Sequence, residues 1–204
     1  MMNNTPDSSL IDNLCEALRC LPGVGPKSAQ RMTFHLLQRA RPQGKLLAQT
    51  LLLAMDKIIH CQRCNTFSQT PLCRVCDNEK RDKSVLCIVE NPNDLIAIEQ
   101  THSYQGCYFV LMGRLSPLDG IGPADIGIDK LMNLLRSESI KEVIFAINPN
   151  MEGEATLYYL SQLMNPLNLK LSQLAHGVPV GTELEYLDSK TIKRAMKERN
   201  AIEA

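Results

Sequence analysis

The chain has no tryptophan, and aromatic residues make up only 4% of its 204 positions. Recognition of single-stranded bases usually needs aromatic side chains on which successive bases stack. The composition therefore leaves phosphate contact as the expected mode of any nucleic-acid binding. The chain also has a formal net charge of zero, because its 22 lysines and arginines balance its 22 aspartates and glutamates. Any contact with a polyanion must then come from a local basic patch.

Long apolar runs are also missing from the sequence. No stretch of about 18 uncharged apolar residues occurs, and the first residues, MMNNTPDSSLIDNL, lack the basic region and apolar segment of a secretory signal. We expect a cytoplasmic, nucleoid-associated protein that makes no contact with a membrane. In a reducing compartment the eight cysteines are expected to be metal ligands or buried side chains rather than disulfides.

Four cysteines between residues 61 and 76 separate two regions of different pattern, and the first of these regions is helical. Apolar residues at helical spacing predict a helix from residue 9 to about 21. A second helix is expected to begin at Pro26 and to be closed by Pro42 and Gly44. A third apolar helix is expected from about residue 46 to residue 59.

The region after these cysteines alternates between two kinds of segment. Short apolar runs at residues 85–89, 108–112, 143–147 and 169–174 predict strands. Helices are expected to begin near residues 93, 128 and 154. This alternation predicts an α/β fold with a mostly parallel sheet, followed from residue 177 by an exposed segment.

The sequence LPGVGPKS at residues 21–28 lies between the first two predicted helices. Gly23 and Gly25 allow a tight turn whose backbone approaches a ligand, and the next helix begins with unpaired N–H groups that suit a phosphate. Lys27 and Arg31 are four residues apart and share a helical face beside that turn. The pattern resembles the helix-hairpin-helix, a module that binds the DNA backbone without reading its sequence. The alternative is an ordinary helix connection with two solvated cations.

The most specific local signal is a pair of CxxC motifs. Their members are Cys61, Cys64, Cys73 and Cys76. Two such motifs present four thiolates to one ion, so the spacing predicts a tetrahedral Zn²⁺ site. Four sulfurs close the coordination sphere, and the metal is therefore expected to be structural rather than catalytic. The alternatives are two disulfides or a redox-active CxxC, and the latter is disfavoured because neither pair follows a predicted strand.

Other candidate ligands near these motifs are expected to take no part in the zinc site. Four cysteines lie in apolar stretches and are expected in the core: Cys15, Cys20, Cys87 and Cys107. His60, adjacent to the first CxxC motif, would be a fifth ligand and is expected to be incidental.

Acidic and amide residues follow two of the predicted strands. Glu90 follows the first, and the third is followed by Asn148, Asn150, Glu152 and Glu154. Loops at the carboxyl ends of parallel strands are where α/β proteins place their sites. The arrangement resembles a Toprim domain, whose catalytic members hold Mg²⁺ with a glutamate and an Asp-x-Asp-x-Asp-Gly run.

This run is altered at two positions, since Asn148 and Asn150 stand where catalytic Toprim domains have aspartates. Neutral amides coordinate hard cations weakly, so two-metal catalysis is expected to be disabled and any Mg²⁺ to bind weakly at best. The remaining carboxylates could hold one ion loosely, contact a partner, or act as solvated charges at a helix N-terminus.

The order of these modules resembles the RecR family of bacterial recombination proteins. The resemblance extends over residues 8–197 and is carried further by GRLSPLDGIGP at residues 113–123 and GVPVGTELEY at 177–186, with Thr182 where the family has glycine. The resemblance implies an ordered set of regions: a helix-hairpin-helix DNA-binding region at 1–56, a four-cysteine zinc finger at 57–80, a Toprim-like domain at 81–176 and a Walker B-like oligomerisation segment at 177–204.

The resemblance also implies a function. Members of the family are non-enzymatic recombination mediators that form ring-shaped oligomers, typically tetramers, around DNA. They act with RecO and RecF to place RecA on gapped DNA coated by single-strand-binding protein. Lys27 and Arg31 would line the ring, and the Toprim-like region would contact partners. Two alternatives stay open, namely a Toprim-type metal-dependent nuclease or nucleotidyl-transfer enzyme, and an adaptor that binds only proteins.

Overall fold

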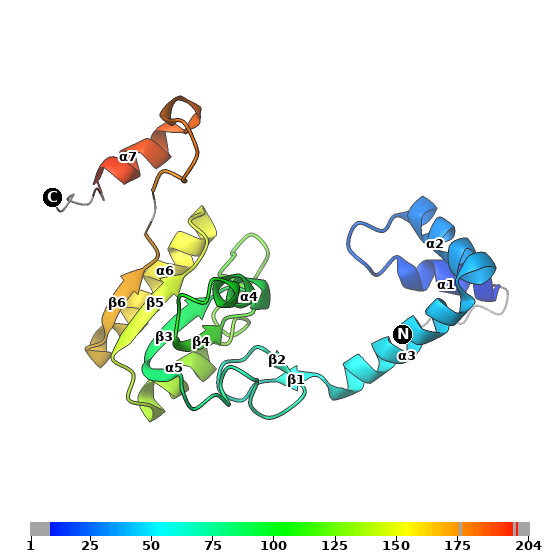
Figure 1. Ribbon diagram of the computed structural model, residues 1–204, viewed down its shortest axis with the longest axis horizontal. Helices are drawn as coiled ribbons and strands as arrows, with labels where there is room; N and C mark the ends of the chain where they lie inside the picture. Colours follow the sequence, from blue (N-terminus) through cyan, green and yellow to red (C-terminus); the bar gives the residue numbers. More distant parts are fainter. Residues whose placement is uncertain (1–8, 176, 198, 200–204) are drawn as a thin grey trace. The chain divides into compact units, whose positions relative to one another are not determined.

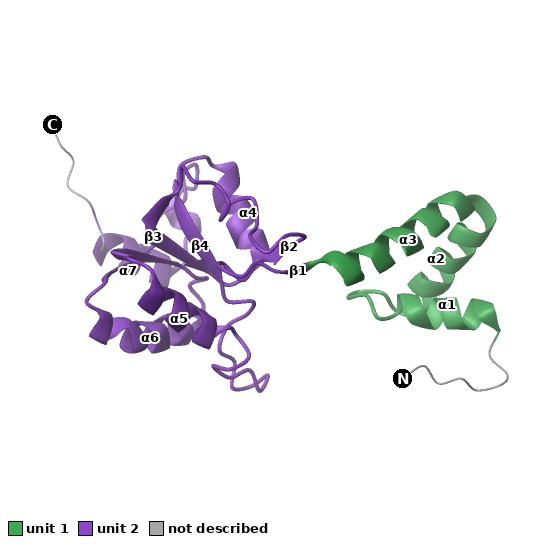
Figure 2. Cartoon of the chain, turned by 90° about the horizontal axis from the view of Figure 1, so that it is seen from below, with its two compact units in different colours: residues 1–58 green, residues 59–204 purple. Residues whose placement is uncertain are grey.

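The computed structural model (Figure 1) describes residues 9–175, 177–197 and 199. The chain divides into two compact units, residues 1–58 and residues 59–204, which are coloured separately in Figure 2. The first unit is helical and the second contains the parallel sheet, as the α/β prediction requires.

The first unit contains α1 (Leu10–Leu18), α2 (Pro26–Arg39) and α3 (Arg41–Lys57). A reciprocal capping box begins α1, because the Ser9 hydroxyl accepts from the Asp12 N–H and the Asp12 carboxylate accepts from the Ser9 N–H. The thiol of Cys15 on α1 donates to the hydroxyl of Thr33 on α2 at 3.3 Å, and Thr33 is buried. This contact joins the two helices on either side of the glycine turn.

The expected boundary between the second and third helices is wrong in its detail. Pro42 opens α3 instead of closing α2, and Gly44 lies inside α3. The physical reason is that proline lacks only an N–H that has no partner in the first turn of a helix anyway. A break of one residue, Ala40, is enough to separate the two helices.

The second unit begins with a two-stranded antiparallel ladder and continues into a four-stranded parallel sheet of order β4-β3-β5-β6. Its elements are β1 (Ile59–His60), β2 (Phe67–Ser68), β3 (Asp82–Val89), α4 (Pro92–Gln100), β4 (Gly106–Val110), α5 (Ile128–Ser137), β5 (Glu142–Ala146), α6 (Met151–Met164), η1 (Asn165–Leu167), β6 (Lys170–Gln173), η2 (Leu184–Tyr186) and α7 (Ser189–Lys197). In the part of the chain that the structure describes, no helix is long and apolar enough to cross a membrane.

Different elements pack against the two faces of the parallel sheet. Leu86 and Ile88 of β3 point to the face packed against α5 and α6, whereas Cys87 and Val89 point to the other face. That second face packs against Leu95 of α4 and against the buried cysteines of the two CxxC motifs. The cysteine module therefore shares its core with the sheet instead of building one of its own.

The cysteine module also pairs with the end of one edge strand of the sheet. Val110, at the end of edge strand β4, donates its N–H to the carbonyl of Cys64 at 2.8 Å. The Asn65 side-chain amide donates to the Val110 carbonyl at 2.9 Å. Backbone groups that an edge strand would leave open are thus paired by the first CxxC knuckle.

Candidate zinc and nucleic-acid sites

The glycine turn between α1 and α2 has the geometry that its sequence predicts. Gly23 has a φ of +77°, a conformation that side chains rarely adopt, and Val24 donates its N–H to the Leu21 carbonyl at 3.1 Å. Gly25 is the N-cap of α2, with Pro26 at the first helical position. Among the described residues no side chain hydrogen-bonds to this helix N-terminus. Its first-turn N–H groups are therefore open to an anion.

Lys27 and Arg31 lie one turn apart on α2, beside this open N-terminus. Both side chains are exposed, and neither has a hydrogen-bond or ion-pair partner within the described residues. Two unpaired cations next to free N–H groups make a surface that attracts phosphate and reads no base.

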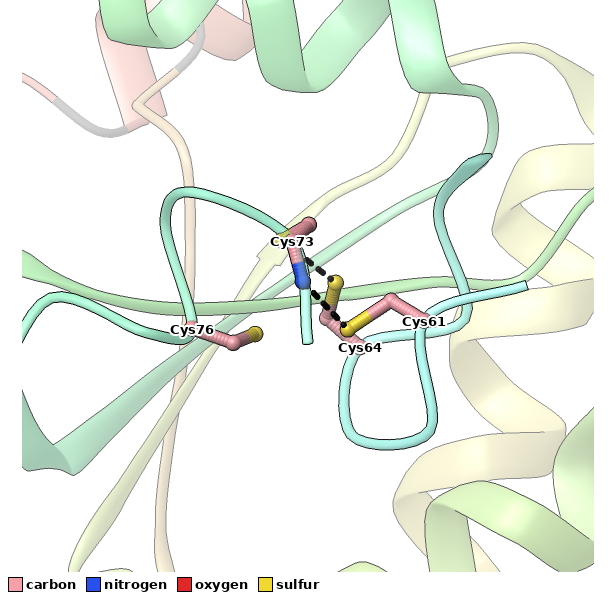
Figure 3. Close-up of side chains that lie close together, drawn as sticks. All are labelled: Cys61, Cys64, Cys73 and Cys76. Carbon is pink, nitrogen blue, oxygen red and sulfur yellow. Dashed lines mark hydrogen bonds between the residues drawn. The ribbon is translucent and has the colours of Figure 1, made fainter. Parts of the chain in front are cut away.

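The four cysteines of the CxxC motifs converge on one point in the second unit (Figure 3). Their sulfur atoms all lie within 4.8 Å of one another, and all four side chains are buried. The Cys64 and Cys73 sulfurs are 3.5 Å apart, and the Cys73 backbone N–H donates to the Cys61 sulfur at 3.3 Å. Hydrogen bonds from Cys64 and Cys76 lower the pKa of Cys73. The same contacts, together with burial, raise the pKa of Cys64, so the lowered pKa belongs to one sulfur of the cluster and not to all four.

The expectation that neither CxxC pair follows a strand is wrong, since the two-residue strand β1 directly precedes Cys61. A redox-active site needs only one CxxC motif. The convergence of both motifs on one point is therefore stronger evidence against a redox site than their position relative to strands. His60 is incidental to the cluster, as expected, and its Nδ1 lies 2.8 Å from the Asn65 carbonyl.

All eight cysteines lie in the described part of the chain and are free thiols. Burial raises the pKa of the Cys87 thiol to about 12, as expected for a core side chain, and Cys107 is also buried. The expectation is wrong for Cys20, which is exposed because α1 ends at Leu18 and leaves it in the following turn.

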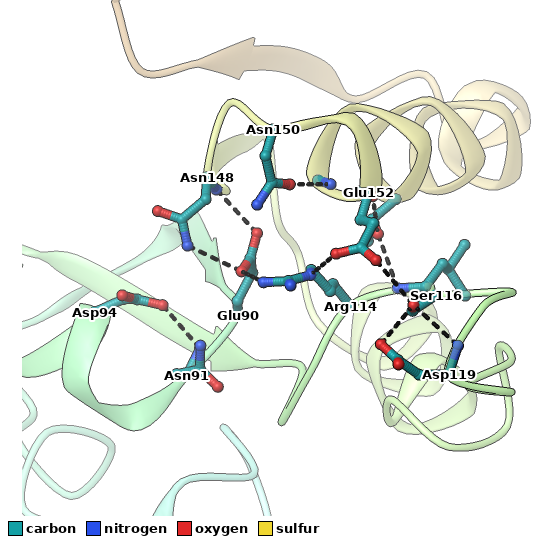
Figure 4. A network of polar contacts seen from close by, with 12 residues as sticks. Glu90, Asn91, Asp94, Arg114, Ser116, Asp119, Asn148, Asn150 and Glu152 are labelled. Carbon is teal, nitrogen blue, oxygen red and sulfur yellow. Dashed lines mark hydrogen bonds and ion pairs between the residues drawn. The ribbon is translucent and has the colours of Figure 1, made fainter.

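The residues of the altered Toprim run take separate structural roles (Figure 4). Glu90, at the carboxyl end of β3, is 1% exposed and accepts hydrogen bonds from the Asn148 N–H and side-chain amide, both at 2.9 Å. Asn150 caps α6 by accepting from the Gly153 N–H at 2.7 Å. Only glycine fits at 153, because a Cβ there would lie 2.0 Å from the Asn148 carbonyl oxygen.

A positively charged side chain, that of Arg114, lies among these carboxylates. Arg114, after strand β4, pairs with Glu152 and has its Nη1 atom 3.9 Å from Glu90. Glu152 also accepts from the Ser116 hydroxyl at 2.9 Å. Glu154 lies apart from this group and pairs with Arg194 of α7 at 3.4 Å.

This arrangement does not fit Mg²⁺. Two aspartates of the catalytic pattern are amides, and both amides are used in hydrogen bonds: Asn148 donates to Glu90, and Asn150 accepts from the Gly153 N–H. The Arg114 guanidinium supplies the positive charge that an ion would otherwise bring. Across the described ranges, the cysteines form the one group of side chains close enough to hold a metal. The suggestion that the three glutamates share an ion is therefore not supported by their geometry.

Arg114 was not among the residues predicted from the sequence, although its position just after a predicted strand is the same feature that identified Glu90. Arg114 follows the strand predicted at residues 108–112, and carboxyl ends of neighbouring parallel strands meet at one edge. Arg63, within the first CxxC motif, was missed as well. Its partner Glu138 is 75 residues away in the sequence, and no local pattern joins the two.

The open hairpin, the convergent cysteines and the sheet with its altered acidic run define a modular DNA-binding protein with a structural zinc site and a Toprim domain. Family models agree with each part: the RecR helix-hairpin-helix matches residues 11–55, the RecR zinc finger domain with four cysteines matches 58–78, the Toprim domain matches 84–175 and the RecR C-terminal region matches 177–200.

Curated relatives extend this agreement to nearly the whole chain. Recombination protein RecR of Legionella pneumophila subsp. pneumophila strain Philadelphia 1 is 54% identical over 192 residues, which cover 94% of this chain and 96% of the relative. The protein of the same name from Legionella pneumophila strain Corby is also 54% identical over 192 residues, covering 98% of that relative. The chain therefore belongs to the RecR family of recombination proteins. Its four clustered cysteines are a structural zinc site.

Proposed function

We propose that this chain is a non-enzymatic mediator of recombinational DNA repair. In this proposal it forms a ring-shaped oligomer, expected to be a tetramer, that encloses DNA and acts with RecO and RecF to place RecA on gapped DNA coated by single-strand-binding protein. The observation that carries the DNA-binding part is the uncapped N-terminus of α2 with two unpaired cations, Lys27 and Arg31, beside it.

The surface of α3 supports self-association. None of its residues is buried within the described chain, although it is rich in leucine. Its side chains that are more than half exposed include Leu46, Leu47, Leu51, Leu52, Leu53 and Met55. Apolar helix surface on this scale needs cover. A second copy is the natural occupant, because Leu47 of this helix also lines a largely apolar groove of about 400 Å³, whose lining includes Leu36 and the cation Arg31.

The C-terminal segment offers further apolar side chains for contacts between copies. Val180, Leu184 and Tyr186 are each more than 60% exposed. Their exposure supports the expectation that this segment packs on a neighbouring subunit. In the Toprim region, the exposed Glu154 is the candidate for partner contact, whereas Glu90 is too buried to meet a partner and instead positions the Asn148 loop.

Oligomerisation would also explain how a chain with no net charge can bind DNA. A single subunit offers only a small cationic surface, but several copies facing one DNA add their phosphate contacts. The affinity then becomes high at low salt and falls steeply as salt rises. An adaptor that binds only proteins would leave DNA unbound even at low ionic strength, so a salt-resolved DNA titration separates the two functions.

The open N-terminus of α2 makes Gly25→Ser an informative substitution. A Cβ at this position meets nothing within 4 Å, and serine is a good N-cap. We expect the unfolding free energy to stay unchanged or to rise by only about 0.3 kcal/mol, since serine is only slightly better than glycine as an N-cap. DNA affinity is expected to fall several-fold, because that hydroxyl competes with phosphate for the same N–H groups. Chemical denaturation and fluorescence anisotropy with labelled DNA measure the two effects.

Gly44→Ser in α3 is the matched control for this substitution. A Cβ there makes only ordinary contact with Leu36 at 3.6 Å, and the site lies outside the hairpin. Its DNA affinity is expected to equal that of the wild type. If Gly25→Ser also binds DNA normally, the hairpin N–H groups are not the phosphate site.

The nuclease alternative is tested by Glu90→Gln. Both carboxylate oxygens of Glu90 accept hydrogen bonds from Asn148, and glutamine would replace one of these acceptors with an NH₂ donor. We therefore expect the unfolding free energy to fall by about 1–3 kcal/mol. Glu154→Gln, at an exposed ion pair, is the control and is expected to cost less than about 1 kcal/mol. Neither variant nor the wild type is expected to cleave or extend DNA with Mg²⁺. Turnover in the wild type that Glu90→Gln abolishes would establish an enzyme instead.

A further inference from the structure

Arg63 lies between two zinc ligands, inside the first CxxC motif, and its side chain is only 10% exposed. It forms a two-pronged pair with Glu138, the residue that follows α5. The Nε donates at 2.8 Å and the Nη2 at 2.5 Å to the two carboxylate oxygens. This geometry is the strong, directional form of an arginine–carboxylate contact. The pair joins the knuckle to the C-terminal end of α5.

The third nitrogen of the same guanidinium has no partner. Arg63 Nη1 is buried and is the one buried side-chain nitrogen or oxygen without a hydrogen bond in the described structure. Leaving a buried charged donor unsatisfied is costly, so an anionic group is expected within its reach.

The groups around Arg63 indicate which anion this is. Arg63 lies between the ligands Cys61 and Cys64 in the sequence, and its largely buried side chain lies in the same knuckle as their sulfur atoms. These two sulfurs lie within 4.8 Å of those of the other two ligands. A Zn²⁺ ion held by four thiolates carries a net charge of about −2, and here the cluster is buried.

We propose that Arg63 is the charge-compensating positioning residue of the zinc site. Its positively charged guanidinium offsets the negative charge of the metal–thiolate group. Its two hydrogen bonds to Glu138 join that group to the end of α5. Residues around a metal's direct ligands commonly change metal affinity on the order of 10–100-fold. The alternative is that Arg63 and Glu138 form a purely structural clasp, with no influence on the metal beyond holding the knuckle in place.

Substitutions at the two ends of the pair separate these roles. Zinc transfer from the purified full-length protein to a colorimetric chelator gives the release rate, and thermal unfolding of the zinc-loaded protein gives the stability. We expect Arg63→Met to accelerate zinc release at least tenfold. Arg63→Lys, which keeps the charge but loses the fork, should stay near the wild-type rate. Glu138→Gln should also retain zinc, because it leaves the positive charge in place.

The second CxxC motif supplies a matched control. Arg74 lies between Cys73 and Cys76, carries the same charge and is exposed. Arg74→Met is expected to leave the zinc release rate unchanged. If Arg63→Met does not fold, Arg63→Lys and Glu138→Gln still decide the question. Fast zinc release from either of them, or equal effects of Arg63→Met and Glu138→Gln, would show a structural clasp and overturn the proposal.

Discussion

Removal of zinc is expected to unfold the cysteine module and to destabilise the whole of residues 59–204. Structural zinc supplies on the order of 10 kcal/mol, which is comparable with the entire stability of a typical domain. The four buried cysteines pack against Cys87, Tyr108 and Val110 of the sheet, and the first knuckle pairs the end of edge strand β4. Loss of the metal is therefore expected to expose part of one face of the sheet and the end of strand β4.

Thermal unfolding with and without a strong chelator measures this effect, and zinc release is followed at the same time. Cys64→Ser should reproduce the result of chelation without any added reagent. Cys20→Ser is the matched control, since Cys20 is exposed and distant in sequence from the cluster. An unfolding temperature that is unchanged after the zinc has left would contradict a structural role for the metal.

Replacement of Lys27 and Arg31 by alanine is expected to have the largest effect on DNA binding. Each lost phosphate contact lowers the slope of log affinity against log salt by about 0.9 on duplex DNA, and in an oligomer the loss occurs in every copy. We expect DNA affinity at low salt to fall by at least tenfold. Because both side chains are exposed and unpaired within the described residues, stability should change by less than about 0.5 kcal/mol.

A double substitution elsewhere tests whether position or bulk charge is responsible. Lys80→Ala with Lys83→Ala removes the same charge from exposed positions in the second unit. Its DNA affinity is expected to stay within about twofold of the wild type, a change of roughly 0.4 kcal/mol. Equal losses from the two double variants would indicate general attraction to positive charge and would remove the hairpin from its proposed role.

The parts of the fold that could be predicted from the sequence are those with a local physical signal. Ser9 and Asp12 stand three residues apart, as a capping box requires, and the spacing of the four cysteines matches one tetrahedral ion. The apolar strands are likewise recognisable, since a strand buried on both faces has few polar residues. Each of these features depends on residues that are near one another in the chain.

The parts that could not be predicted depend on contacts between distant residues. The position of Arg114 after a strand was recognisable, but its pairing with Glu152, 38 residues away, is visible only when β4 and α6 are both in place. The same holds for Arg63 and Glu138. The absence of buried residues on α3 was also not predictable, because an apolar helix is usually expected to find its cover within its own chain.

The most direct test of the central claim is the salt dependence of DNA binding, measured together with the mass of the protein in solution. Two cations from one hairpin give a log–log slope of at most about 1.8 in magnitude on duplex DNA. A self-associated protein that pools its hairpins is predicted to show a much steeper slope and a mass of several subunits. A monomer whose DNA affinity does not change between low and high salt would contradict it.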